Sequence, residues 1–154
     1  MREMTDQPKT PIRTLIVDRN QESLMENKQA LLASDQVEIC AETTSFALAV
    51  SHVERSKPDF VFCGVDNNPD EAFTFIEKIR DKFPLLRIVC VGESNEPEMI
   101  LRCFRTGADE YLIKPLQHET LLEMFPRLRT RHVTSTPPPQ PLPEKKGQDR
   151  KSVV

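Results

Sequence analysis

The chain has 154 residues, of which 38% are hydrophobic and 29% charged, and its formal net charge is −3. Such a length and composition are typical of one globular domain with a single hydrophobic core. No apolar run approaches the ~20 residues that a membrane-spanning helix needs, and residues 1–11 are too polar for a signal peptide. We therefore expect a cytoplasmic protein that does not enter a membrane.

Five short apolar runs rich in Val, Ile and Phe have the pattern of strands that are buried on both faces of a sheet. They cover residues 13–18, 37–42, 60–65, 87–92 and 110–113. The segments between them have helical spacing of their apolar residues, and only the stripe in 46–56 is weak. Strict alternation of strands and helices predicts an α/β fold with a doubly wound parallel sheet of order 2-1-3-4-5 and helices on both faces.

The two ends of the chain differ in composition from its body. We expect a disordered arm over residues 1–11, a folded domain over 12–130 and a disordered tail over 131–154. The tail contains five prolines within 137–143 and carries a net charge of +3, so residues 1–130 carry −6. A solubilising end is the simpler interpretation. The alternative is a partner-binding motif, because Pro138 and Pro141 have Pro-x-x-Pro spacing.

The predicted topology brings together residues that are far apart in the sequence. Ligands of open α/β sheets gather at the carboxyl ends of the strands. Asp18, Gly64, Gly92 and Lys114 each stand at or just beyond such an end. We therefore expect these four residues to be neighbours in the folded protein.

Four motifs, in this order, resemble those of the response-regulator receiver domain. They are Leu15-Ile16-Val17-Asp18, Pro58-Asp59 followed by the apolar run to Gly64, Gly107-Ala108-Asp109-Glu110-Tyr111, and Lys114-Pro115. The resemblance covers roughly 120 residues, the usual size of one domain. It implies a flavodoxin-like signalling module of two-component phosphorelay systems. In that family an aspartate accepts a phosphoryl group, two acids hold Mg²⁺, and a hydroxyl residue and a lysine complete the pocket.

The sequence departs from the family pattern at three pocket positions. Arg19 stands where the second acid is expected, Gly64 where the acceptor aspartate is expected, and Gly92 where the hydroxyl residue is expected. A cation disfavours Mg²⁺, and glycine has no side chain to phosphorylate. Asp18 and Lys114 alone are retained. We therefore expect a degenerate receiver, a pseudo-receiver, that is not an enzyme, binds no cofactor and acts through protein–protein interaction.

Asp66 is the basis of the alternative hypothesis. If Asp66 accepted the phosphoryl group and shared a displaced Mg²⁺ with Asp18, the protein would be an ordinary phosphorylatable receiver. Asp66 lies ~6.5 Å beyond position 64 at strand rise, which places it outside the expected reach of Lys114 for in-line transfer. A turn acid is the simpler role, with Asp70 as the N-cap of the next helix.

Lys114 is then expected to pair with Asp18 or Asp66, and its bond to Pro115 to be cis, as in the family. A third hypothesis is a small-anion site at Lys114 and Arg19.

A docking face is expected on the fourth helix, fifth strand and fifth helix, because receivers commonly bind partners or dimerise there. Arg105, Tyr111 and Glu119 mark this face. The expected partner is a signalling protein or a second copy of the chain. The short basic run of the tail lacks an aromatic platform or a folded basic face, so nucleic acid is not expected.

The remaining cysteines and histidines indicate no chemistry. Cys40, Cys63, Cys90 and Cys103 have no CxxC spacing, which favours reduced, buried thiols over a metal site or disulfides. The three histidines stand apart from one another and suggest neither a phosphorelay nor a metal site.

Overall fold

The structure, a computed structural model, describes residues 11–134, and the side chains of 11–129. The elements are β1 (Ile12–Val17), α1 (Gln21–Ala33), β2 (Val37–Thr43), α2 (Phe46–Ser56), β3 (Phe60–Gly64), α3 (Pro69–Lys82), β4 (Arg87–Gly92), α4 (Pro97–Thr106), β5 (Glu110–Ile113) and α5 (His118–Thr134). All pairs of neighbouring strands are parallel, and the order within these residues is β2-β1-β3-β4-β5. The predicted fold is confirmed, and each strand begins and ends within one residue of its predicted position.

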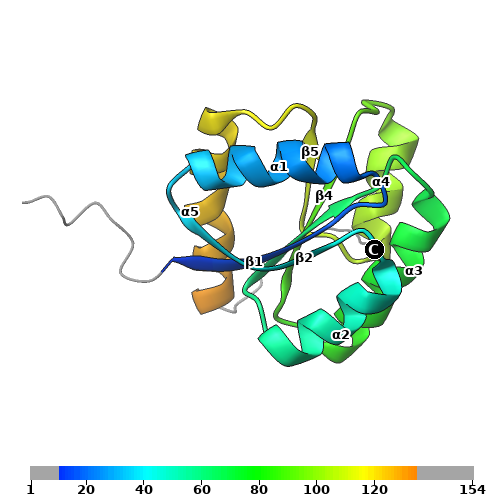
Figure 1. Cartoon of the computed structure of the whole chain (residues 1–154), viewed down its shortest axis with the longest axis horizontal. Helices are drawn as coiled ribbons and strands as arrows, with labels where there is room; N and C mark the ends of the chain where they lie inside the picture. The colour runs from blue at the N-terminus through cyan, green and yellow to red at the C-terminus, as the bar shows by residue number, and fades with distance from the viewer. Residues whose placement is uncertain (1–10, 135–154) are drawn as a thin grey trace, which may run out of the picture.

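Three layers make up the domain. Helices α1 and α5 cover one face of the sheet, and α2, α3 and α4 cover the other (Figure 1). β3 and β4 are buried along their whole length because they lie at the centre of the sheet, between both helical layers. Their side chains alternate between the two sides, so each strand contributes to two cores.

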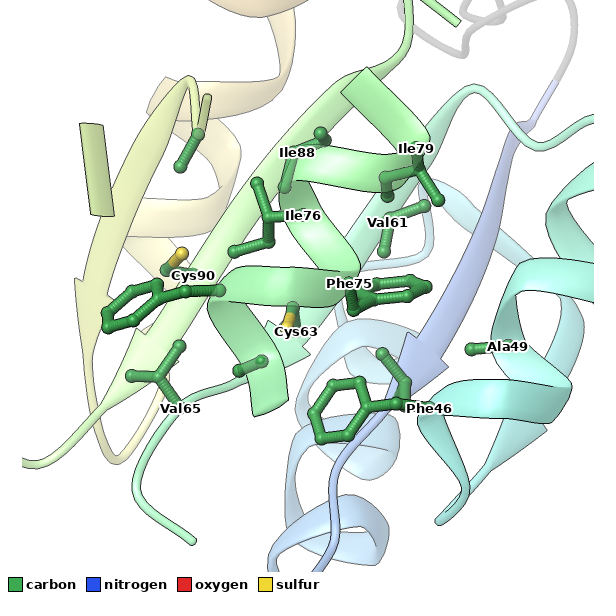
Figure 2. Close-up of a cluster of buried hydrophobic side chains, with 14 of the residues drawn as sticks. Phe46, Ala49, Val61, Cys63, Val65, Phe75, Ile76, Ile79, Ile88 and Cys90 are labelled. Atoms are coloured by element: carbon green, nitrogen blue, oxygen red, sulfur yellow. The ribbon is translucent and has the colours of Figure 1, made fainter. Parts of the chain in front are cut away.

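The larger core lies between the sheet and α2, α3 and α4. Figure 2 shows Ile76 and Ile79 of α3 above Val61 and Ile88 of the central strands. The Phe46 ring of α2 packs against that of Phe75, with centroids 5.4 Å apart.

The second core lies under α1 and α5. Phe60 meets Phe125 edge to face at 5.8 Å. Burial of these apolar surfaces is the main stabilising contribution.

Helix starts follow the capping preferences of Asn and Ser. Asn20 and Ser45 cap α1 and α2 by accepting backbone N–H bonds. The prediction that Asp70 caps α3 is wrong. Asn68 is the cap, since Pro69 takes the first helical position, where a missing N–H costs nothing. Asp70 instead forms an exposed ion pair with Arg102 at 3.0 Å.

Helix α5 continues to Thr134, four residues beyond the predicted domain boundary at residue 130. The sequence contains no proline between 127 and 136 to end the helix earlier. Residues 1–10 and 135–154, which include the predicted arm and the Pro-x-x-Pro spacing, lie outside the described residues. Among the described helices, none is long and apolar enough to cross a membrane.

All four cysteines are free thiols, and Cys63, Cys90 and Cys103 are buried as expected, whereas Cys40 is only half-buried.

Candidate functional site

The carboxyl ends of β1, β3, β4 and β5 meet at one edge of the sheet, as the topology predicted. The register pairs Val17 with Cys63, Gly64 with Val91 and Gly92 with Ile113. Asp18 and Lys114 follow β1 and β5 directly. The four residues expected to be neighbours therefore line the same end of the sheet.

Asp18 is almost fully buried and both of its carboxylate oxygens accept hydrogen bonds. Its side chain is 2% exposed. Oδ2 accepts from Ser23 Oγ at 2.7 Å, and Oδ1 accepts from the Asn20 backbone N–H at 2.9 Å. A buried carboxylate is costly unless its oxygens are satisfied, and these two bonds satisfy them. Asp18 thus organises the start of α1 rather than facing an open pocket.

The Asp18 carboxylate fills the space that a side chain at position 64 would need. A Cβ on Gly64 would lie 2.1 Å from Asp18 Oδ2 and 2.4 Å from its Cγ. Real Cβ atoms essentially never approach other atoms below 3.0 Å. The absence of a side chain at Gly64 is therefore what allows Asp18 to take this position.

Lys114 pairs with Asp66, one of the two partners expected from the sequence. Its Nζ lies 2.9 Å from Asp66 Oδ2 and donates to Ser23 Oγ at 2.8 Å. The contact with Oδ2 is an ion pair without hydrogen-bond alignment. Asp66 Oδ1 accepts the Glu93 backbone N–H at 2.9 Å. Asp18, Ser23, Lys114 and Asp66 thus form one continuous polar chain.

Asp66 lies closer to Lys114 than the strand-rise argument against in-line transfer assumed. The strand-rise argument assumed that β3 continues past position 64, but the strand ends at Gly64. The chain then turns, and the long lysine side chain spans the remaining gap. The Lys114–Pro115 bond is cis, as expected.

Arg19 does not join this polar chain. Its guanidinium forms a surface ion pair with Glu71 in the first turn of α3. A shallow hollow of about 370 Å³ lies beside Arg19, Asn20, Asn67 and Asn68. Lys114 is not among its lining residues, so the two cations of the predicted anion site do not share this hollow.

Tyr111 fills the space beside Gly92. A Cβ on Gly92 would lie 2.6 Å from the Tyr111 hydroxyl oxygen and 2.9 Å from Asp66 Oδ1. The hydroxyl donates to the Ser94 carbonyl at 2.7 Å, so it ties β5 to the loop between β4 and α4. Burial, reinforced by the Asp66 carboxylate, raises the pKa of Tyr111 to about 12. The phenol is neutral at pH 7 and acts as a donor.

This inward position corrects the expected docking face. Tyr111 is only 9% exposed, so it cannot contact a partner directly. Arg105 and Glu119 are exposed, as expected. The large apolar side chains exposed on α4, β5 and α5 are Leu101, Phe104, Ile113 and Leu122. The sequence pointed to these three elements as the expected face. Which of their side chains are exposed depends on which of them turn inward.

Ser23 is the site residue that the sequence analysis missed. It is 6% exposed and bridges Asp18 and Lys114. The signal was a hydroxyl residue in the first turn of the helix that follows β1, but serine near a helix start usually indicates capping.

Comparison with known protein families agrees with this fold. The profile of the response regulator receiver domain matches residues 14–126. The chain belongs to this family. Receiver domains are generally signalling modules that interact with other signalling proteins, and they operate in two-component systems.

Relatives from plants and bacteria match the chain at low identity. The two-component response regulator-like PRR1 of Oryza sativa subsp. japonica is 27% identical over 76% of this chain and 23% of its own length. The nitrate/nitrite response regulator protein NarL of Escherichia coli K12 is 24% identical over 73% of this chain and 52% of its own length. The receiver thus spans about half or less of these two relatives. Chemotaxis protein CheY of Bacillus subtilis is 26% identical, over 60% of this chain and 78% of its own length.

Solved structures support the same fold. A CheY-like response regulator receiver domain protein from Methanospirillum hungatei JF-1 superposes with a TM-score of 0.69 at 20% identity, covering 82% of this chain and all of the other. A two-component response regulator from Clostridium difficile gives 0.65 at 25% identity, with coverage of 78% and 97%.

The residues of this receiver do not fit the Mg²⁺ ion that the family implies. Mg²⁺ requires octahedral oxygen ligands, usually including one or two carboxylates. Asp18 has both oxygens engaged by N–H and O–H donors, and Asp66 is paired with Lys114. Residues 11–129 contain no group of three or more His, Cys, Asp or Glu side chains that could hold a metal. The amino group of Lys114 takes the place beside Asp66 that a cation would need.

Proposed function

We propose that this receiver acts without phosphoryl transfer, as a pseudo-receiver that signals through protein–protein contact. The observation that carries the proposal is the position of Asp18, whose carboxylate lies within 2.1 Å of where a side chain at Gly64 would begin. Phosphoryl transfer depends on a positioned acceptor and on charge neutralisation by metal and cations. At this edge the acceptor position is filled by a carboxylate that bonds to its own helix. On this proposal the domain is a cytoplasmic binding module and not an enzyme.

The Gly92 and Tyr111 geometry supports a single conformation of the domain. A ligand or modification shifts an equilibrium only when two conformations differ in their affinity for it. The Tyr111 hydroxyl takes the space next to Gly92 and is held by the Ser94 carbonyl. We infer that α4 and β5 present one constant surface to partners.

The surface that we propose for docking lies on α4, β5 and α5. β5 is an edge strand of the sheet, and Leu101, Phe104, Ile113 and Leu122 are each 37–48% exposed there. Exposed apolar side chains together with nearby charges such as Arg105 and Glu119 suit a specific protein partner. The partner on this proposal is another signalling protein or a second copy of the chain, and neither nucleic acid nor a membrane is involved.

One observation favours the alternative function. Lys114 lies 2.9 Å from Asp66, and a lysine next to an acceptor aspartate is what the family chemistry requires. If Asp66 were an acceptor, the protein would be a phosphorylatable receiver. A beryllofluoride titration separates the two functions, because this phosphoryl mimic needs an acceptor carboxylate and Mg²⁺.

The experiment follows amide NMR shifts of the full chain with millimolar Mg²⁺ and beryllofluoride. We expect no saturable shifts at Asp18, Gly64 or Lys114. Saturable shifts that disappear in Asp66→Asn but persist in the control variant Asp70→Asn would establish the alternative and overturn the pseudo-receiver proposal.

A second experiment tests the docking face. Phe104→Glu and the double variant Arg105→Glu/Glu119→Lys are compared with the unmodified chain in cross-linking from native cell extract and in analytical ultracentrifugation. Leu48→Glu on α2 is the matched control, because Leu48 is 55% exposed but lies on a different face. We expect both face variants to lose contacts that the control retains. Equal loss in Leu48→Glu, or retention in the face variants, would exclude this surface.

A further inference from the structure

A second hollow lies at the opposite edge of the sheet, at the amino ends of β3 and β4. Its volume is about 510 Å³, within the ~300–1,000 Å³ range of small-molecule sites. The carboxyl-terminal ends of α2 and α3 and the residue Arg129 of α5 complete its walls. None of its lining residues belongs to the polar chain around Asp18 and Lys114.

The wall of this cavity is apolar and continuous with both cores. Val53, Phe60 and Leu86 line it, and each is more than 90% buried. Phe83 and Leu85 form its outer part, and Leu85 is 60% exposed. An exposed leucine beside an open apolar hollow leaves hydrocarbon surface in contact with water. The hollow thus suits a ligand with an apolar body.

The mouth of the cavity is positively charged. The lining residues that carry charge are Lys57, Lys82, Arg87 and Arg129, with Asp59 as the one acid among them. Two of these cations already have partners: Lys82 pairs with Glu54, and Arg87 lies 3.7 Å from Asp109. Lys57 and Arg129 form no ion pair within residues 11–129. These two are available to a ligand.

The cations of this cavity are not explained by their position near the carboxyl-terminal ends of helices alone. Helix carboxyl termini attract cations in general, so two cations alone would not indicate a ligand. Here the Arg13 guanidinium already donates to the carbonyls of Ser56 and Lys57 at the end of α2. The indicative feature is the combination of an apolar wall with two cations, Lys57 and Arg129, that form no ion pair among the described side chains.

We propose that this cavity binds a small amphipathic anion, a carboxylate with a hydrocarbon or aromatic body. The body packs against Val53, Phe60 and Leu86, and the acid group lies at the mouth with Lys57 and Arg129. The positive charge of Lys57 and Arg129 favours an anion over a neutral or cationic ligand of equal size. This site is independent of the proposed docking function, because it lies at the other edge of the sheet.

Octanoate is the probe, titrated into the full chain while amide NMR shifts are recorded. 1-Octanol and octyltrimethylammonium are the matched neutral and cationic probes with the same hydrocarbon chain. We expect saturable octanoate shifts at Val53, Lys57, Phe60 and Leu86, weaker binding of octanol and the weakest binding of the cation. Equal affinity for octanoate and octyltrimethylammonium, or no saturable shift with octanoate, would overturn the proposal.

Two variants locate the acid group. Lys57→Asn keeps a residue that tolerates the left-handed conformation of this position (φ 49°), and Arg129→Gln removes the second charge. Each is expected to weaken octanoate binding about tenfold, as for the loss of one charged hydrogen bond. Lys78→Gln, an exposed position elsewhere on α3, should leave affinity unchanged. Unchanged affinity in both cavity variants contradicts the proposal. Shifts of residues 135–143 that accompany octanoate binding would also contradict it, by identifying the tail as the occupant.

Discussion

The two edges of the sheet differ in how their space is used. At the carboxyl edge, the Asp18 carboxylate and the Tyr111 hydroxyl fill the spaces beside Gly64 and Gly92. Lys114 pairs there with Asp66 and is linked to Asp18 through Ser23. At the amino edge, a cavity of about 510 Å³ remains open, and its lining residues Lys57 and Arg129 form no ion pair within residues 11–129. The edge where the family carries out its chemistry is thus packed by the protein's own side chains. The spaces directly beside Gly64 and Gly92 are not left empty, because neighbouring side chains occupy them.

The largest effect is expected at the ion pair of the closed edge. Asp66→Ala leaves the Lys114 ammonium, whose side chain is 13% exposed, without its acid, and should lower the free energy of unfolding by about 3 kcal/mol. Urea denaturation measures this loss of stability. Asp70→Ala is the control, four residues away in an exposed pair with Arg102, and should change stability by less than about 1 kcal/mol. Similar losses in both variants would mean that the Lys114 pair is not a buried one.

The next effect concerns the space beside Asp18. Gly64→Ala introduces a Cβ that displaces the carboxylate from Ser23, and we expect a loss of about 1 to 2 kcal/mol. The same substitution in an Asp18→Ala background should be neutral or stabilising, because alanine lowers the entropy of the unfolded chain. Denaturation of the four proteins gives the coupling energy. Additive losses would show that Asp18 does not fill this space.

A smaller effect is expected in the ionisation of the single tyrosine. The chain has one tyrosine and no tryptophan, so the ultraviolet absorbance of phenolate reports Tyr111 alone. With the pKa of Tyr111 raised to about 12, the folded protein retains the phenolic proton after the unfolded chain has lost its own near pH 10. Stability is therefore full below about pH 10 and declines as the pH rises toward 12. A titration midpoint of the phenolate absorbance near pH 10 in the folded protein would indicate that the Tyr111 phenol is exposed.

The smallest effects are expected at the open edge. Lys57→Asn and Arg129→Gln remove cations that have no acidic partner in the described part of the chain, so each should change the free energy of unfolding by less than about 0.5 kcal/mol. Thermal unfolding without added ligand measures this change. A loss comparable to that of Asp66→Ala would show that these cations stabilise the fold and are not reserved for a ligand.

Sequence patterns predict the elements of this domain, their order in the sheet and the edge where the site residues meet. Hydrophobic periodicity and strand–helix alternation are local patterns, and the right-handed crossover rule converts them into one topology. Even the weak stripe of 46–56 proved to be α2, because Phe46, Ala49 and Val53 are the residues it buries. The glycines at 64 and 92 were also visible in the sequence as departures from the family pattern.

The arrangement of side chains at each edge of the sheet depends on contacts between distant segments and is visible only in the folded protein. The choice of Asp66 over Asp18 as the partner of Lys114 depends on where β3 ends, and the inward position of Tyr111 depends on the space left at Gly92. The cavity at the amino edge is formed by residues from three helices and two strands, which no local pattern relates. Periodicity reports which face of an element is buried, whereas rotamers and cavities depend on the packing of side chains from distant segments.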